Sequence, residues 1–108
     1  MPGPALGFEA MVVGCRTIIV VLSGDFDVCN TAALADHLAE VAAYRPRRLV
    51  FEMAEVSFMD CASVRLIVGV RRSLPEGTRP VISNSPLVVG RVLHILGLDA
   101  LCDLTGQM

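Results

Sequence analysis

The chain has 108 residues, of which 54% are hydrophobic, and its formal net charge is −2. This size and composition predict one folded domain over residues 1–108 and argue against disorder. No apolar run approaches the roughly 20 residues that a membrane-spanning helix needs. The first four residues (MPGP) also lack the basic and apolar regions of a signal peptide. We therefore expect a cytoplasmic protein that does not insert into a membrane.

The basic residues do not indicate a nucleic-acid partner. All nine are arginine, and three of them (Arg45, Arg47 and Arg48) fall together in a predicted loop. Nucleic-acid binding domains usually combine a strongly basic face with aromatic side chains. This chain has one tyrosine, no tryptophan and a negative net charge. We expect the arginine cluster to be a solvated turn.

The cysteines and histidines do not predict a metal site. The four cysteines (Cys15, Cys29, Cys61 and Cys102) form no CxxC pair, and only two histidines are present. In a cytosolic protein the thiols should be mostly reduced. No nucleophile, base and orienting group come together in the sequence, so we expect neither a cofactor nor enzyme activity.

Apolar patterning predicts an α/β fold with the element order β-β-α-β-α-β-α-β. The β-branched run over residues 18–21 is typical of a strand, and because it is continuous we expect both of its faces to be covered. Alternating strands and helices imply a largely parallel sheet with crossover helices. The predicted elements are strands over 8–13 and 17–22, a helix capped at Asn30 or Thr31 and ending before Pro46, a strand over 48–53, a helix over 62–73, a strand over 80–83, a helix starting at Ser85 and Pro86 and ending at Gly97, and a strand over 101–104.

Residues 59–63 (MDCAS) join a predicted strand, through a short polar turn, to the helix over 62–73. Such a junction presents backbone N–H groups and a positive helix end, which favour anionic groups such as a phosphate or a thiolate. On this helix, spacing predicts that Leu66, Ile67 and Val70 point inward. Arg65 and Arg72, seven residues apart, should share one exposed face.

Three motifs resemble those of the STAS domain family of anti-sigma factor antagonists. Residues 22–27 (LSGDFD) resemble its "LxGelD" motif, and residues 49–60 resemble "lvlDlsxvxfhDS". Residues 92–99 (VLHILGLD) resemble its "vLexxGld" motif, and the similarity runs from about residue 12 to 104. The resemblance implies a mixed, mostly parallel sheet with helices packed on one side, and a protein-binding regulatory role.

Many members of this family bind an ATP-dependent serine kinase that doubles as an anti-sigma factor. The kinase phosphorylates a Ser or Thr after the second acidic motif and so releases the antagonist. The resemblance therefore implies an anti-sigma factor partner, acidic positions at Asp27 and Asp60, and the switch position at Cys61. The expected partner-binding and switch residues are Asp27, Asn30, Asp60, Cys61, Ala62, Ser63 and Arg65.

The chain also departs from the family pattern. Cys61 is not a substrate for an ordinary serine kinase, so it is either a silent replacement or a thiol switch; the helix end favours its thiolate and Asp60 opposes it. In the family fold the loops carrying Cys29 and Cys61 lie side by side, which makes these two a possible redox pair. Ser63 stands in a glycine position and is either an alternative phosphosite or an ordinary helix serine, exposed or bonded to its own turn.

Other readings stay open at this point. Glu52 is displaced by about one position from the acidic residue that the family often has in this strand. Little sequence remains after Leu104 for the family's terminal helix, and an apolar patch left there would favour a homodimer. STAS-like domains also serve as non-catalytic regulatory subunits of membrane transporter ATPases. A module that senses nucleotides or small ligands is a further alternative.

Overall fold

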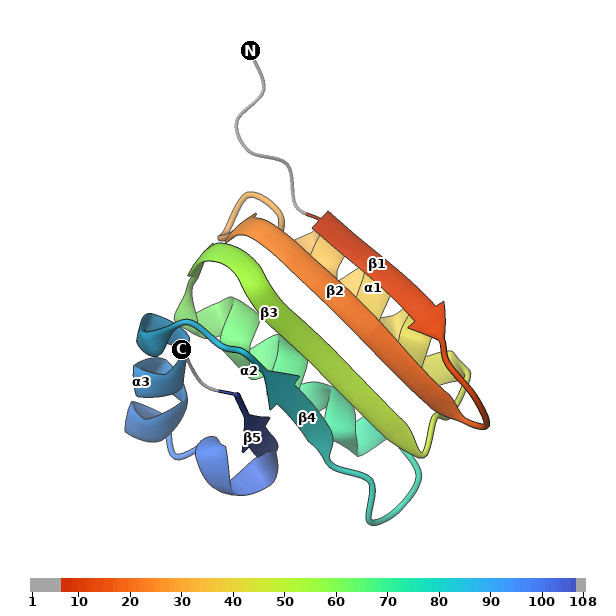
Figure 1. Ribbon diagram of the computed structural model, residues 1–108. Coiled ribbons are helices and arrows are strands. Elements are labelled where there is room, and N and C mark those ends of the chain that lie inside the picture. The colour runs from red at the N-terminus through yellow and green to blue at the C-terminus, as the bar shows by residue number, and fades with distance from the viewer. Residues whose placement is uncertain (1–6, 107–108) are drawn as a thin grey trace.

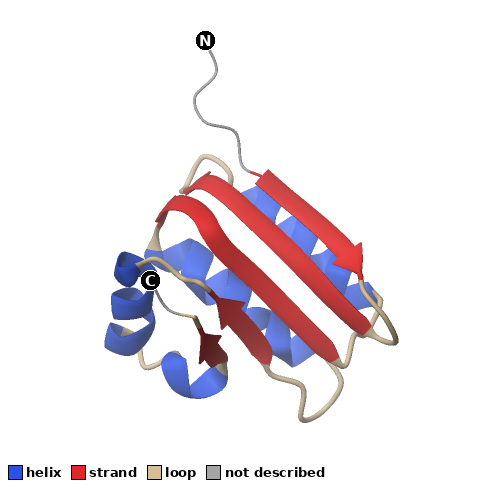
Figure 2. Cartoon of the chain, viewed as in Figure 1, coloured by secondary structure: helices blue, strands red, loops and turns tan. Residues whose placement is uncertain are grey.

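In the computed structural model, which describes residues 7–106, a five-stranded sheet is covered by helices on one side (Figures 1 and 2). The ends of the domain predicted over 1–108 lie outside the described residues. The strands are β1 (Gly7–Val12), β2 (Thr17–Phe26), β3 (Arg48–Met59), β4 (Pro80–Ser83) and β5 (Asp103–Thr105), and the helices are α1 (Thr31–Ala43), α2 (Cys61–Gly69) and α3 (Leu87–Ile95), with 3₁₀ turns η1 (Val70–Ser73) and η2 (Asp99–Leu101).

The sheet has the strand order β1-β2-β3-β4-β5. β1 pairs with β2 in the antiparallel direction, as a hairpin does, and the other three pairs are parallel. Each parallel step needs a crossover, which α1, α2 and α3 supply in turn. The predicted mixed, mostly parallel sheet and its element order are therefore confirmed.

β2 is covered on one face only. Ile18, Val20 and Leu22 are buried against the helices, whereas Ile19 and Val21 between them are only half-buried. The prediction that both faces of this run are covered is therefore wrong. The β-branched side chains on the open face favour strand geometry by themselves, without a second layer to bury them.

β3 is twice as long as predicted, because residues 54–59 continue the strand instead of forming a polar turn. Its pairing with β2 shifts register between Val21 and Ser23 and again between Gly24 and Asp25. At each shift β3 uses one more residue than β2, as in a β-bulge. The bulges bring Met53, Val56 and Met59 to the buried face at intervals of three residues.

The core lies between the sheet and the helices. Phe26, Phe51 and Leu34 are fully buried there. Ile67 and Val70 are buried as predicted, whereas Leu66 is only half-buried at the edge of the core. The predicted helix over 62–73 is an α-helix up to Gly69 and a 3₁₀ turn from Val70 onward. This core fixes where the loops at the carboxyl ends of β2 and β3 lie.

The C-terminal end of α3 lies where the sequence predicted it, but the N-terminal end does not. Gly97 adopts a left-handed φ of 70°, and Leu98 N–H donates to the Leu93 carbonyl at 2.8 Å, which confirms the predicted glycine stop. At the other end Ser85 is buried and does not cap the helix; Pro86 occupies the N-cap position instead. The predicted serine cap is therefore wrong, since the helix begins one residue later.

Candidate functional site

Two loops lie side by side at the carboxyl ends of β2 and β3. Phe26 and Met59, the last residues of these strands, are register partners. The Asp60 N–H donates a hydrogen bond to the Phe26 carbonyl at 3.0 Å. The loop after Phe26 and the α2 N-terminus after Asp60 are thereby tied together, as expected for neighbouring parallel strands.

The loop between β2 and α1 is held by its own polar side chains. Asn30 Oδ1 accepts from the Asp27 N–H at 3.0 Å, and Asn30 Nδ2 donates to the Asp25 carbonyl at 2.7 Å. Asp27 Oδ1 accepts from the Cys29 N–H at 2.9 Å, and the Thr31 hydroxyl donates to the Asp27 carbonyl at 2.9 Å. Asn30 occupies the N-cap position but makes no side-chain cap bond to the helix. The expected capping role is wrong, because the loop uses this amide.

Asp60 caps α2. Its Oδ1 accepts from the Ser63 N–H at 2.8 Å, and the residue has the extended conformation of an N-cap. Cys61 and Ala62, the first two residues of the helix, are exposed. The Cys61 thiol is therefore presented to solvent at the positive end of α2.

Ser63 is fully buried, and its hydroxyl has no hydrogen-bond partner. It was expected to be exposed or bonded within its own turn. The third residue of a helix that packs on a sheet turns toward the core, which explains the difference. In this conformation the hydroxyl is not accessible to a kinase.

Arg65 and Arg72 are both exposed on the outer side of α2 and η1, as predicted. Within residues 7–106 the ion pairs are those of Arg79 with Asp103 and of His94 with Asp99. The guanidinium groups of Arg65 and Arg72 thus have no carboxylate partner in the described part of the chain.

The four cysteines are free, and they fall into two environments. Cys15, Cys29 and Cys61 are exposed, whereas Cys102 is buried. Burial raises the pKa of the Cys102 thiol, and the nearby Arg79 opposes this only in part. Cys102 is therefore an inert, protonated core thiol, whereas Cys29 and Cys61 are accessible on the two neighbouring loops.

Comparison with known proteins decides the family. The STAS domain family profile matches residues 10–106, nearly the whole chain. The chain belongs to the STAS domain family. This confirms the resemblance seen in the three motifs.

Relatives of this STAS domain are named as anti-sigma factor antagonists. It is 24% identical over 81 residues to the anti-sigma-F factor antagonist RsfB of Mycobacterium tuberculosis, a match covering 75% of this chain and 66%, just under two thirds, of RsfB. A solved anti-sigma factor antagonist from Mycobacterium paratuberculosis superimposes with a TM-score of 0.84 at 20% identity, covering 96% of this chain and 88% of the other. The Bacillus cell fate determinant SpoIIAA in its phosphorylated form gives a TM-score of 0.70 at 20% identity, with coverage of 91% and 90%. The solved structures establish the shared fold.

Two exposed apolar side chains beside the loops were not among the expected site residues of this STAS domain. Val28 is 81% exposed in the loop between Asp27 and Cys29, and Phe58 is 46% exposed at the end of β3. An apolar residue between polar loop residues was the only available signal for Val28. Phe58 lies within the motif over residues 49–60, but its exposure could not be predicted, because it depends on the bulge beside it.

Glu52 of this STAS domain has a structural role. Both of its carboxylate oxygens accept from Asn84 Nδ2 at 3.1 Å, and Oε1 also accepts from the Ala54 N–H at 3.0 Å. These bonds link β3 to the end of β4. The displaced acidic position noted in the sequence is therefore used within the fold.

Among the described residues, no group of three or more His, Cys, Asp or Glu side chains could hold a metal ion. His37 stacks on Phe8, with ring centroids 4.8 Å apart, and His94 bonds to Asp99 at 3.1 Å. No helix within residues 7–106 is long and apolar enough to cross a membrane.

Replacing Asp60 by alanine should destabilise this STAS domain by about 1 kcal/mol, because the Ser63 N–H at the start of α2 loses its acceptor. Asp60→Asn is the matched control, since asparagine is an equally good N-cap residue. Urea unfolding of the three proteins measures the difference. An alanine variant as stable as the wild type would show that the cap contributes nothing. An asparagine variant as unstable as the alanine one would show that the loss does not come from the cap hydrogen bond.

Proposed function

We propose that this STAS domain is a non-catalytic, cytoplasmic regulatory module that docks on an anti-sigma factor of the serine-kinase type. The relatives named as anti-sigma factor antagonists support this class of partner. The docking surface that we propose consists of the two neighbouring loops and the outer side of α2. Its residues are Asp27, Val28, Asn30, Asp60, Cys61, Ala62 and Arg65, with Ser63 buried beneath them.

The observation that carries the proposal is the exposed Cys61 thiol, which the start of α2 and the neighbouring loop hold in place. It is the first residue of α2, directly after the Asp60 cap, and the loop of Asp27 is tied to it through the Phe26–Asp60 backbone bond. A preorganised surface binds at a lower entropic cost than a mobile one. The exposed Val28 supplies apolar area, and Arg65 supplies a charge that no carboxylate within residues 7–106 pairs with.

Cys61 replaces the hydroxyl that the family resemblance places at this position. A thiol does not accept phosphate from an ordinary serine kinase, so the partner should stay bound in the presence of ATP. The module would then act as a constitutive antagonist. The buried Ser63 does not provide a substitute phosphosite in this conformation.

A thiol-based switch is the second form of this proposal. Cys29 and Cys61 are both exposed, on loops joined by a backbone hydrogen bond. An oxidant such as diamide would take the two thiol hydrogens and leave a disulfide, which requires Cα atoms roughly 4.4–6.8 Å apart. The pair remains a prediction that an intact-mass measurement after oxidation would test.

Reversing the charge of Arg65 tests the docking surface. Arg65→Glu should weaken binding to the anti-sigma factor about tenfold or more, which corresponds to roughly 1.4 kcal/mol. Arg47→Glu is the matched control, because Arg47 is equally exposed but precedes β3, at the opposite end of that strand. Calorimetric titration compares the two. Equal affinities for Arg65→Glu and the wild type would remove α2 from the interface.

A further inference from the structure

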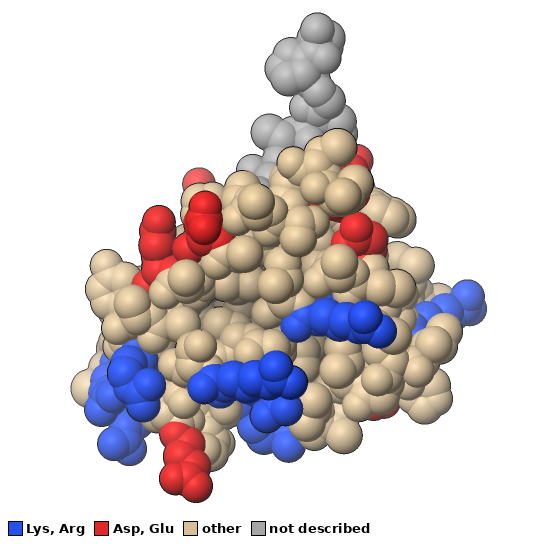
Figure 3. All heavy atoms as spheres, turned by 180° about the vertical axis from the view of Figure 1, so that it is seen from behind, with Lys and Arg blue, Asp and Glu red and all other residues tan. Residues whose placement is uncertain are grey.

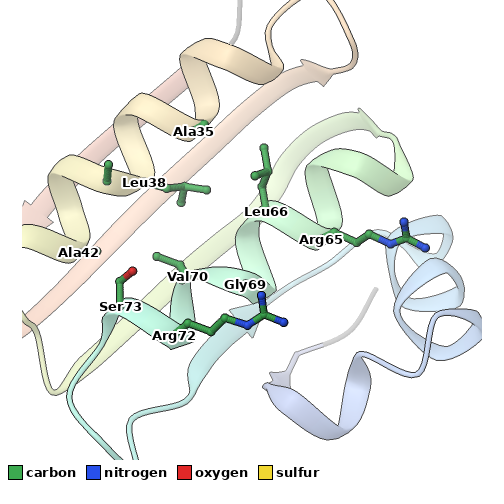
Figure 4. A pocket seen from close by; sticks show the side chains of 10 residues that line it. Ala35, Leu38, Ala42, Arg65, Leu66, Gly69, Val70, Arg72 and Ser73 are labelled. Carbon is green, nitrogen blue, oxygen red and sulfur yellow. The ribbon is translucent and has the colours of Figure 1, made fainter.

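A groove runs between α1 and α2 on the helix-covered side of the molecule (Figure 4). It encloses about 340 Å³. Its lining is largely apolar and includes the small residues Ala35, Ala39, Ala42 and Gly69 together with the larger side chains of Leu38, Leu66 and Val70, of which Leu38 and Val70 are buried. Arg65 and Arg72 line it from the α2 side. The groove shares Arg65 with the docking surface and extends from it along α2 to α1 and η1, away from the two loops.

Gly69 leaves part of the groove open. This residue has ordinary helical angles, φ −64° and ψ −18°, so its backbone conformation does not require glycine. A Cβ added there would meet nothing within 4 Å, so the packing of the protein does not require glycine either. Glycine in a helix costs about 0.5–1 kcal/mol relative to alanine. Gly69 therefore lowers helix stability without filling the space beside it, and this open space allows another chain to approach the backbone of α2 closely.

The charge around the groove is positive. Arg65 and Arg72 have no carboxylate partner among residues 7–106. At the end of the groove Arg45 Nη1 lies 3.4 Å from the carbonyl oxygen of Ser73, to which it donates. Figure 3 shows basic side chains across the middle and lower part of this side of the molecule, with acidic ones mainly along its upper part. The acidic residues of α1, Asp36 and Glu40, are not among the lining residues.

We propose that this groove binds an acidic amphipathic helix of a partner protein. Two packed helices with small residues between them present a groove into which the ridge of a third helix fits. Arg65 and Arg72 are seven residues apart, about two helical turns or roughly 11 Å. The partner helix would therefore carry two carboxylates at this spacing along one edge of an alanine- and leucine-rich face. Its apolar side chains would fill the space above Gly69.

The test uses a helix-stapled peptide of about four turns, with an Ala/Leu face and two glutamates seven residues apart. Titrated into the ¹⁵N-labelled full chain, it should shift the amide signals of Ala35, Ala39, Gly69 and Ser73 in a saturable way. The same peptide with lysines in place of the glutamates should bind at least tenfold more weakly. Absence of saturable shifts in these amides, or equal binding of both peptides, would overturn the proposal.

Variants at the groove separate this site from the docking surface. Gly69→Leu should fill the groove and lower peptide affinity at least tenfold, whereas Gly69→Ala, which adds only a Cβ in open space, should retain most of it. Arg72→Glu leaves one positive and one negative side chain at the groove, so it should bind the lysine and glutamate peptides about equally. Cys61→Ser should bind the peptide like the wild type, whatever its effect on the anti-sigma factor. Unchanged peptide binding by Gly69→Leu would refute the proposal. Shifts of the groove signals that depend on protein concentration in the absence of peptide would also refute it, because they would show that a second copy of the chain occupies the groove.

Discussion

Cys61→Ser is expected to return phosphorylation control to this STAS domain. The substitution puts a hydroxyl on the exposed first residue of α2, where the backbone N–H groups and the helix end favour a phosphate. With the anti-sigma factor kinase and labelled ATP, the variant should take up close to one phosphate per chain and then dissociate, since a charge of about −2 enters the interface. The wild type should remain unlabelled and bound.

Cys29→Ser is the matched control for this experiment. It places the same hydroxyl on an exposed residue of the neighbouring loop, but outside a helix N-terminus. It should remain unlabelled. Labelling of the wild type or of Cys29→Ser to the same extent as Cys61→Ser would show that position 61 is not the switch position. An unlabelled Cys61→Ser variant in a stable complex would lead to the same conclusion.

Phe26→Ala should have the largest effect on stability, a loss of about 3–5 kcal/mol. Phe26 is fully buried at the end of β2, and its carbonyl accepts the bond that ties the two loops together. The substitution leaves a cavity under both loops. Because small domains have only about 5–15 kcal/mol of stability, the variant should unfold at a much lower urea concentration than the wild type.

Phe58→Ala serves as the control for this change. Phe58 lies on the neighbouring strand one residue before Met59 but is 46% exposed, so its truncation removes little buried area and leaves no cavity. Its cost should stay near or below 1 kcal/mol. If the two variants lost equal stability in urea unfolding, the anchoring role of Phe26 would be wrong.

The sequence predicted the parts of this fold that depend on local patterning. The strands rich in β-branched residues, the helices with apolar residues at helical spacing and the Gly97 stop formed in the expected order. The last strand was misplaced: it was expected over 101–104 and spans Asp103–Thr105, because the 3₁₀ turn η2 continues to Leu101. The second half of β3 could not be predicted, because its buried residues Met53, Val56 and Met59 follow a spacing of three that only the bulges explain. A regular strand would bury every second residue, so this spacing does not indicate a strand. Three residues are also too few to indicate a helix.

The site was predicted less completely than the fold. The motifs located Asp27, Asp60 and Cys61, and the structure places them on two adjoining loops. They did not reveal that Ser63 is buried or that the Asn30 side chain bonds within its loop, since both depend on how the helices sit on the sheet. The sequence also did not predict the groove beside Gly69, because the role of a glycine in a helix depends on which elements pack around it.

The central claim is that the loops around Cys61 dock on an anti-sigma factor and that phosphorylation does not release it. The most direct measurement is a calorimetric titration of the purified protein with the anti-sigma factor kinase of its own organism, with and without Mg²⁺-ATP. We predict one complex of equal affinity under both conditions, weakened by Arg65→Glu. Absence of binding in both, or loss of binding on addition of ATP, would contradict the account.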